Sequence, residues 1–188
     1  HPVSVQSMCN TKTDDIPSTL AQLEALKQEG ADIGRLAVPD RTAAEALPML
    51  VKQSPLPLVA DIHFDHRLAL AAVEAGCAGL RINPGNIGAA VKVRELAAAA
   101  KAAGVPIRIG VNGGSLDKDI RDQYGGVTAE GLCEAALRQA VLLEDAGFSA
   151  IKISLKASDL PVMLAANRRL SAMCDYPLHI GVTETGTL

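Results

Sequence analysis

Charged and amide side chains stand at alternate positions within runs that are otherwise apolar. Arg81 and Asn83 flank Ile82, and Arg108 lies four residues before Asn112. Successive side chains of a β-strand point to opposite faces, so each polar pair shares one face of its strand. A charge within a buried strand is costly unless it is paired or faces a wet cavity. The spacing therefore indicates strands whose polar face lines a functional cavity.

Other runs repeat this pattern. Arg35 lies in the second expected strand, and Asp61 and His63 share a face of the third. Lys156 ends the sixth. Basic groups at matching depth in several strands concentrate positive charge, which Asp61 offsets locally. The planar guanidinium binds phosphate oxygens through two parallel hydrogen bonds. We therefore expect an anion site, and several arginines suit a diphosphate better than a single carboxylate.

Strand-like runs alternate with helix-like stretches along the whole chain. Seven β-type segments are expected, beginning at Val3, Asp32, Leu56, Ala78, Val105, Ser149 and Tyr176. Most of the helical stretches stop at a glycine just before the next strand, as in parallel βα units. A capping box is expected at Thr42–Glu45, and Asp159 is expected to begin the last helix. Residues 113–128 are glycine-rich and charged, and a long loop is expected there.

Polar residues follow nearly every strand, and this distribution separates two architectures. An open doubly wound sheet concentrates its site at one switch point, whereas a (β/α)8 barrel draws site residues from many strand ends. No G-x-G-x-x-G motif follows the first strand. We therefore expect an α/β fold, a (β/α)8 TIM barrel formed by residues 1–188 as a single domain. Because only seven strands are counted, the barrel is expected to be truncated after the seventh.

The overall composition argues against several classes of protein. The chain has 188 residues, enough for one domain, and 48% of them are hydrophobic. The net charge of −3 argues against a nucleic-acid partner, and no apolar run approaches the ~18 residues of a membrane span. The four cysteines lie far apart without a C-x-x-C pair, so neither a disulfide framework nor a zinc site is expected. These features predict a cytoplasmic protein.

Six ordered segments resemble one enzyme family. They read VQSM, VADIHFD, LRINPGNIG, IRIGVN, KISLKASD and GVTE. In this order they are similar to the 4-hydroxy-3-methylbut-2-enyl diphosphate synthases, iron–sulfur enzymes of the non-mevalonate isoprenoid pathway. The resemblance covers essentially the whole chain and implies the TIM-barrel domain of an oxidoreductase. The implied reaction is the two-electron reductive opening of 2-C-methyl-D-erythritol 2,4-cyclodiphosphate with loss of a hydroxyl.

The resemblance also implies roles for particular residues. Those expected to bind the substrate, chiefly through its diphosphate, are Arg35, Arg81, Asn83, Arg108, Asn112 and Lys156. Glu184 matches an acidic group near the substrate hydroxyls and is expected to assist protonation of the leaving hydroxyl. Asp61 and His63 are expected to line the same mouth and complete the set of catalytic candidates.

The family's redox group is not expected in this chain. In the family a [4Fe–4S] cluster is held by three cysteines and a glutamate of a C-terminal domain, and the four cysteines here have the wrong spacing. We therefore expect no metal site in residues 1–188, and a fragment that is inactive alone. For the full-length protein the resemblance implies a homodimer and an electron donor of the ferredoxin or flavodoxin type.

Two other functions fit the same residues. Another phosphate-binding TIM barrel, such as a pterin-type synthase, would need no metal. A non-catalytic anion-binding module would use the basic barrel mouth to capture a phosphorylated metabolite. Continuation of the gene into an eighth strand and a cysteine-bearing domain would favour the redox enzyme over both.

Overall fold

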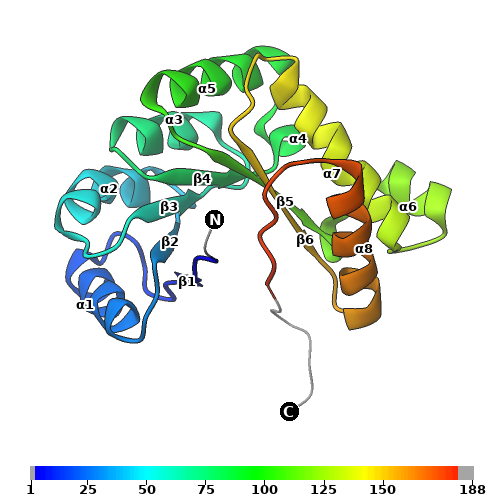
Figure 1. Cartoon of the computed structure of the whole chain (residues 1–188). Helices are drawn as coiled ribbons and strands as arrows, with labels where there is room; N and C mark the ends of the chain where they lie inside the picture. The colour runs from blue at the N-terminus through cyan, green and yellow to red at the C-terminus, as the bar shows by residue number, and fades with distance from the viewer. Residues whose placement is uncertain (1–2, 182–188) are drawn as a thin grey trace.

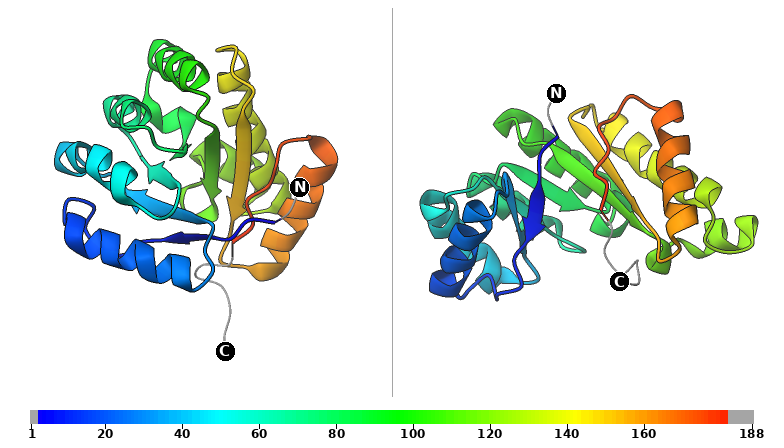
Figure 2. Two further views of the ribbon diagram at one scale, coloured as in Figure 1. Left: turned by 60° about the vertical axis from the view of Figure 1, so that its left-hand side comes forward. Right: turned by 60° about the horizontal axis from the view of Figure 1, so that its bottom comes forward.

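A parallel sheet of six strands forms the centre of the computed structural model, which describes residues 3–181. Each strand pairs with the next one along the chain. The strands are β1 (Gln6–Met8), β2 (Ile33–Ala37), β3 (Leu58–Asp61), β4 (Gly79–Ile82), β5 (Ile107–Asn112) and β6 (Ile151–Lys156). The sheet is curled, and the helices cover its convex face (Figures 1 and 2). This partly closed (β/α) barrel is the fold class that the sequence predicts.

Helices occupy the connections between the strands. The longer ones are α1 (Ile16–Gln28), α2 (Arg41–Gln53), α3 (His66–Glu74), α5 (Ala90–Ala103), α7 (Ala129–Glu144) and α8 (Leu160–Met173). Two short helices, α4 (Pro84–Ile87) and α6 (Lys118–Tyr124), follow β4 and β5. Within residues 3–181, no helix combines the length and the apolar character needed to cross a membrane.

The hydrophobic core lies between the sheet and its helices. Ile107, Ile109 and Val111 of β5 are buried, as are Leu80 and Ile82 of β4. They alternate with the polar residues that the sequence places on the opposite face. Burial of this apolar set against the helices is favourable, and a shift by one residue would expose it. The packing of the outer layer therefore fixes which side chains point into the barrel.

Aspartates are the N-caps of α2 and α8. Asp159 accepts a hydrogen bond from Val162 N at 2.9 Å, which confirms the predicted start of α8. The capping box predicted at Thr42–Glu45 is wrong, because Thr42 already lies inside α2. Asp40 is the N-cap and accepts from Ala43 N at 2.9 Å. Its backbone is extended, at φ −149° and ψ −179°, which presents the carboxylate to the free N–H groups of the first turn.

Two segments differ from the expected secondary structure. Residues 113–128 contain a 3₁₀ turn at Gly113–Ser115 and helix α6, where the sequence predicts a long loop. The strand expected from Tyr176 is present, among the described residues, as a single parallel bridge between Leu178 and Ile153. Pro177 has no N–H to donate, which shortens the ladder at this point. The end of the expected strand, from residue 182 onward, lies outside the described residues.

Candidate functional site

The predicted cationic residues meet in one cavity of about 460 Å³ at the carboxyl end of the sheet. The predicted side chains that line it are Arg35, Asp61, His63, Arg81, Arg108, Asn112 and Lys156. They come from strands β2 to β6 and the turn after β3. All but two of the site residues expected from the sequence are therefore brought together.

Strand register places these side chains at matching levels. Asp61 of β3 pairs with Arg81 of β4, and Arg81 pairs with Arg108 of β5. Closer to the mouth, Asn112 of β5 pairs with Lys156 of β6. Partners in neighbouring strands lie about 4.8 Å apart and point to the same face. The cavity wall thus has one row formed by Asp61, Arg81 and Arg108. A second row, with Asn112 and Lys156, lies closer to the mouth.

One buried carboxylate orients two of the arginines. Asp61 Oδ1 lies 3.2 Å from Arg81 Nη1, and Asp61 Oδ2 lies 3.5 Å from Arg35 Nε. His63 Nε2 is 3.5 Å from the same Oδ1. The Asp61 side chain is only 6% exposed, so these interactions are poorly screened by solvent. Asp61 therefore fixes the positions of Arg35 and Arg81 without neutralising the whole cluster.

Arg108 has no comparable partner. It is 4% exposed, and its Nε, Nη1 and Nη2 atoms lack a hydrogen-bond partner within residues 3–181. Burial lowers the pKa of Arg108 to about 10, with repulsion from Arg35 and Arg81 as the next causes. Arg108 is still protonated at neutral pH. A buried cation with unpaired donors is costly, and an anion in the cavity would relieve that cost.

The positive field extends to both sides of Arg108. Burial lowers the pKa of Lys156, and the three arginines of the cluster lower it further. His179 shares a second cavity, of about 960 Å³, with Arg108 and Lys156. Burial and then repulsion from Arg108 lower the pKa of His179 to about 4. From its position early in the expected seventh strand, the sequence predicts a structural role for His179 and does not place it in the site.

Two predicted site residues are not among the described residues that line the first cavity. Asn83 Oδ1 accepts a hydrogen bond from Gly85 N at 3.2 Å and caps α4. Glu184 lies outside the described residues. Sequence reasoning also missed Gly110, whose missing side chain leaves room for Arg81. A glycine inside a strand was the available signal, since it often marks a close approach.

The rim after β5 is held by a side chain of α6. Arg121 Nη2 donates to the carbonyl oxygens of Gly113 and Gly114, at 3.1 and 3.4 Å. Both glycines line the cavity. The segment expected to be a long loop is therefore anchored by helix α6, and the backbone of Gly113 and Gly114 lies at the cavity.

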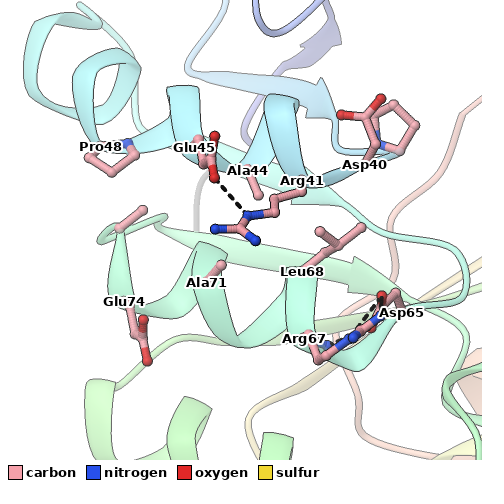
Figure 3. A pocket seen from close by; sticks show the side chains of 12 residues that line it. Asp40, Arg41, Ala44, Glu45, Pro48, Asp65, Arg67, Leu68, Ala71 and Glu74 are labelled. Atoms are coloured by element: carbon pink, nitrogen blue, oxygen red, sulfur yellow. Dashed lines mark hydrogen bonds and ion pairs between the residues drawn. The ribbon is translucent and has the colours of Figure 1, made fainter.

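A third cavity, of about 790 Å³, lies on the outer surface between α2 and α3 (Figure 3). Its two arginines are paired locally. Arg41 Nε lies 2.7 Å from Glu45 within α2, and Arg67 Nη2 lies 2.7 Å from Asp65 at the start of α3. Because both arginines of this cavity are paired, whereas the buried Arg108 of the inner cavity is not, we assign the candidate site to the inner cavity.

The cysteines do not form a ligand set for a metal cluster. Cys9, Cys77 and Cys133 are buried free thiols, and Cys174 is partly buried. Burial raises the pKa of Cys77 to about 12 and that of Cys133 to about 11, whereas iron–sulfur clusters are bound by thiolates. Within residues 3–181, no three His, Cys, Asp or Glu side chains gather as a metal site. The described residues therefore do not fit an iron–sulfur cluster.

Known proteins resemble the chain over its whole length. The family model of the GcpE TIM-barrel domain matches residues 1–188. The chain is 57% identical over 187 residues to the 4-hydroxy-3-methylbut-2-en-1-yl diphosphate synthase (flavodoxin) of Geobacter sulfurreducens. It is 56% identical over 187 residues to the protein of the same name from Mycobacterium bovis. These matches cover 100% and 99% of this chain but 53% and 48% of the relatives, so the chain spans about half the length of the curated relatives it matches.

Solved structures share the fold at much lower sequence identity. Dihydropteroate synthase from Yersinia pestis matches with a TM-score of 0.60 at 14% identity, over 93% of this chain and 68% of that one. Tryptophan synthase from M. tuberculosis matches with a TM-score of 0.59 at 15% identity, over 94% of this chain and 72% of that one. These likenesses show the fold alone. Since the family model spans every residue and the relatives are more than half identical, the chain belongs to the GcpE TIM-barrel domain family.

Proposed function

We propose that this chain is the substrate-binding barrel of a 4-hydroxy-3-methylbut-2-enyl diphosphate synthase, acting in isoprenoid biosynthesis. Its substrate would be 2-C-methyl-D-erythritol 2,4-cyclodiphosphate, and its reaction a two-electron reductive ring opening with loss of a hydroxyl. Arg108 carries this proposal. A buried guanidinium whose three nitrogens have no hydrogen-bond partner in the described chain is suited to a multiply charged anion. The relatives are named as synthases of a diphosphate.

The proposed roles follow the geometry of the cavity. Arg108 and Arg81, which are neighbours across β4 and β5, would bind the diphosphate oxygens, with Arg35 and Lys156 at either side. Asn112 would add a neutral donor at the mouth. These contacts would hold the ring in place and exclude water from one of its sides.

Three further groups would complete the catalytic site. Asp61 keeps Arg35 and Arg81 in place, and His63, whose side chain is 57% exposed, lies 3.5 Å from Asp61. Glu184 is the proposed acid for the departing hydroxyl. Asn83 uses its Oδ1 to cap α4, and its amide nitrogen would be the neutral donor to the substrate.

The electrons would have to come from outside the described residues, because the cysteines here do not fit a cluster. We propose that a [4Fe–4S] cluster bound by another domain of the full-length protein supplies them. The donor to that cluster would be a flavodoxin- or ferredoxin-type protein, and the name of the relatives includes flavodoxin. A homodimer acting in the cytoplasm completes the proposal.

The proposal is tested by titrating the full-length protein with the cyclic diphosphate and measuring turnover under reducing conditions. Arg108→Ala should weaken substrate binding about tenfold to a hundredfold, because a hydrogen bond to a charged group contributes roughly 1.5–3 kcal/mol. Arg67→Ala, in the third cavity between α2 and α3, is the matched control and should bind the cyclic diphosphate normally. Glu184→Gln should bind nearly as wild type and turn over slowly.

Each result separates the competing functions. Binding of the diphosphate without turnover by the reduced full-length protein would favour a non-catalytic anion-binding module. Wild-type affinity in Arg108→Ala would reject the inner cavity as the diphosphate site. Normal turnover by Glu184→Gln would remove the proposed acid.

A further inference from the structure

Gly110 occupies the inner face of β5 between two site residues. Arg108, Gly110 and Asn112 alternate with the buried apolar residues of the strand, and Gly110 pairs with Ser154 of β6. On the other side of β5, Arg81 of β4 pairs with Arg108. The Arg81 side chain extends diagonally from that position and ends over Gly110.

The guanidinium of Arg81 fills the space that any other residue at position 110 would need. A Cβ atom there would lie 2.4 Å from Arg81 Nε, 2.6 Å from Nη2 and 2.8 Å from Cζ. Cβ contacts shorter than 3.0 Å are essentially never seen. Gly110 is not among the glycines with positive φ, so its backbone conformation is open to other residues. The glycine is needed here for space rather than for backbone freedom.

Arg81 has little freedom to move aside. Its Nη1 is bound to Asp61 at 3.2 Å, and the residue is 8% exposed. The cationic neighbours Arg35 and Arg108 line the same cavity and repel it. A methyl group on residue 110 would therefore displace the guanidinium from its plane over β5 or break its pairing with Asp61.

We propose that Gly110 is a positioning residue for the anion site, because its missing side chain determines where the Arg81 guanidinium lies beside Arg108. This inference rests on the proposed binding of a diphosphate in the inner cavity. Two arginines can bind one diphosphate together only when their donors converge on the same oxygens. Gly110 acts on the ligand through Arg81 and need not touch it.

The test compares three glycine-to-alanine variants of the full-length protein by calorimetric titration with inorganic pyrophosphate. Gly110→Ala should bind roughly tenfold more weakly than wild type, as expected for loss of one charge-assisted contact. Gly34→Ala places a Cβ 2.5 Å from Leu23 on the outer face. It should lower the melting temperature and keep wild-type affinity. Gly79→Ala, with a nearest contact of 3.3 Å on the inner face, should change neither strongly.

A double-mutant cycle with Arg81→Ala identifies the mechanism. If Gly110 acts through Arg81, Gly110→Ala should change pyrophosphate affinity by less than about twofold once Arg81 has been removed. Gly110→Ala should likewise change the melting temperature much less in the Arg81→Ala background, since removing the guanidinium removes the clash. A Gly110→Ala protein that does not fold alone should fold in the Arg81→Ala background, and failure there would overturn the proposal.

The remaining outcomes distinguish this inference from the function on which it rests. A wild-type protein that does not bind pyrophosphate would count against the anion site itself. A wild-type protein that binds pyrophosphate, together with a Gly110→Ala variant of equal affinity, would overturn only the role of Gly110. Equal losses from Gly110→Ala with and without Arg81 would also overturn it.

Discussion

Arg108 shows how a binding residue can weaken the fold that carries it. Its guanidinium is buried, repelled by Arg35 and Arg81, and without a hydrogen-bond partner in the described part of the chain. Replacing a poorly compensated buried charge by an apolar side chain of similar volume is often stabilising. Sites of this kind are retained for function at the expense of stability.

Arg108→Met should therefore stabilise the ligand-free protein by about 1–3 kcal/mol and weaken pyrophosphate binding. Urea unfolding of the ligand-free protein measures the first effect, and calorimetric titration measures the second. Arg67→Met, in the exposed third cavity, should have a free energy of unfolding within about 0.5 kcal/mol of the wild-type value. Loss of stability in Arg108→Met would show that the guanidinium has a structural partner after all.

His179 should report on the charge of the cavity. Burial, and after it repulsion from Arg108, Arg35, Lys156 and Lys152, lowers its pKa to about 4. The imidazole is therefore neutral at pH 7. The unfolded chain takes up a proton near pH 6.5 and the folded chain does not. Stability should therefore fall as the pH drops from about 6.5 towards 4.

An NMR titration of His179 checks this prediction. Saturating pyrophosphate should raise the pKa of His179, because a bound anion offsets the cations, and the pKa should stay below 6.5 because burial remains. His179→Gln should flatten the loss of stability between pH 6.5 and 4. A pKa of His179 that did not respond to pyrophosphate would place the anion away from Arg108.

At the scale of elements, the sequence predicts most of the strands and helices because their signals are local. Alternation of polar and apolar residues defines the two faces of β4 and β5, and Asp159 marks the start of α8. Competition between nearby caps is harder to judge. Thr42 begins a good capping box in the sequence. Asp40, whose backbone is extended, is nevertheless the N-cap and accepts the hydrogen bond from the first turn of α2.

This difference predicts unequal effects of two substitutions in α2. Asp40→Ala should destabilise the protein by about 1 kcal/mol, because it removes the acceptor of the Ala43 N–H group. Thr42→Ala should cost less than about 0.5 kcal/mol. Chemical denaturation of both variants provides the measurement. A larger effect at Thr42 than at Asp40 would restore the capping box as the helix start.

At the scale of the whole molecule, the charge is unevenly distributed. The chain carries a net charge of −3, while four cations and one carboxylate line the inner cavity. The convergence of these residues follows from the barrel, and it could be predicted from alternation within the strands together with the polar residues at the strand ends. The individual contacts between strands could not be predicted from the sequence, since they depend on how the strands are aligned with one another. The sharing of Asp61 by Arg35 and Arg81 and the space at Gly110 come from register pairs separated in sequence.

Pyrophosphate should therefore stabilise the whole fold. At a free concentration of 100 times its dissociation constant it should raise the free energy of unfolding by about 2.7 kcal/mol. Affinity should fall only modestly with added sodium chloride, because buried charges are screened less than exposed ones. Thermal melts with and without pyrophosphate, at low and high salt, provide the measurement. Arg108→Met is the control and should gain much less stability from the ligand.

The unpartnered Arg108 also determines how this protein behaves among ordinary solutes. Because binding of any anion relieves the unpaired charge of Arg108, orthophosphate or sulfate should also bind in part of the cavity. Affinities measured in phosphate buffer would then understate binding, and cellular phosphate would act as a standing competitor. An inhibitor should gain selectivity by placing two linked anionic groups on the guanidinium groups of Arg81 and Arg108, which come from neighbouring strands. An inhibitor that relied on negative charge alone would be no more selective for this cavity than phosphate or sulfate.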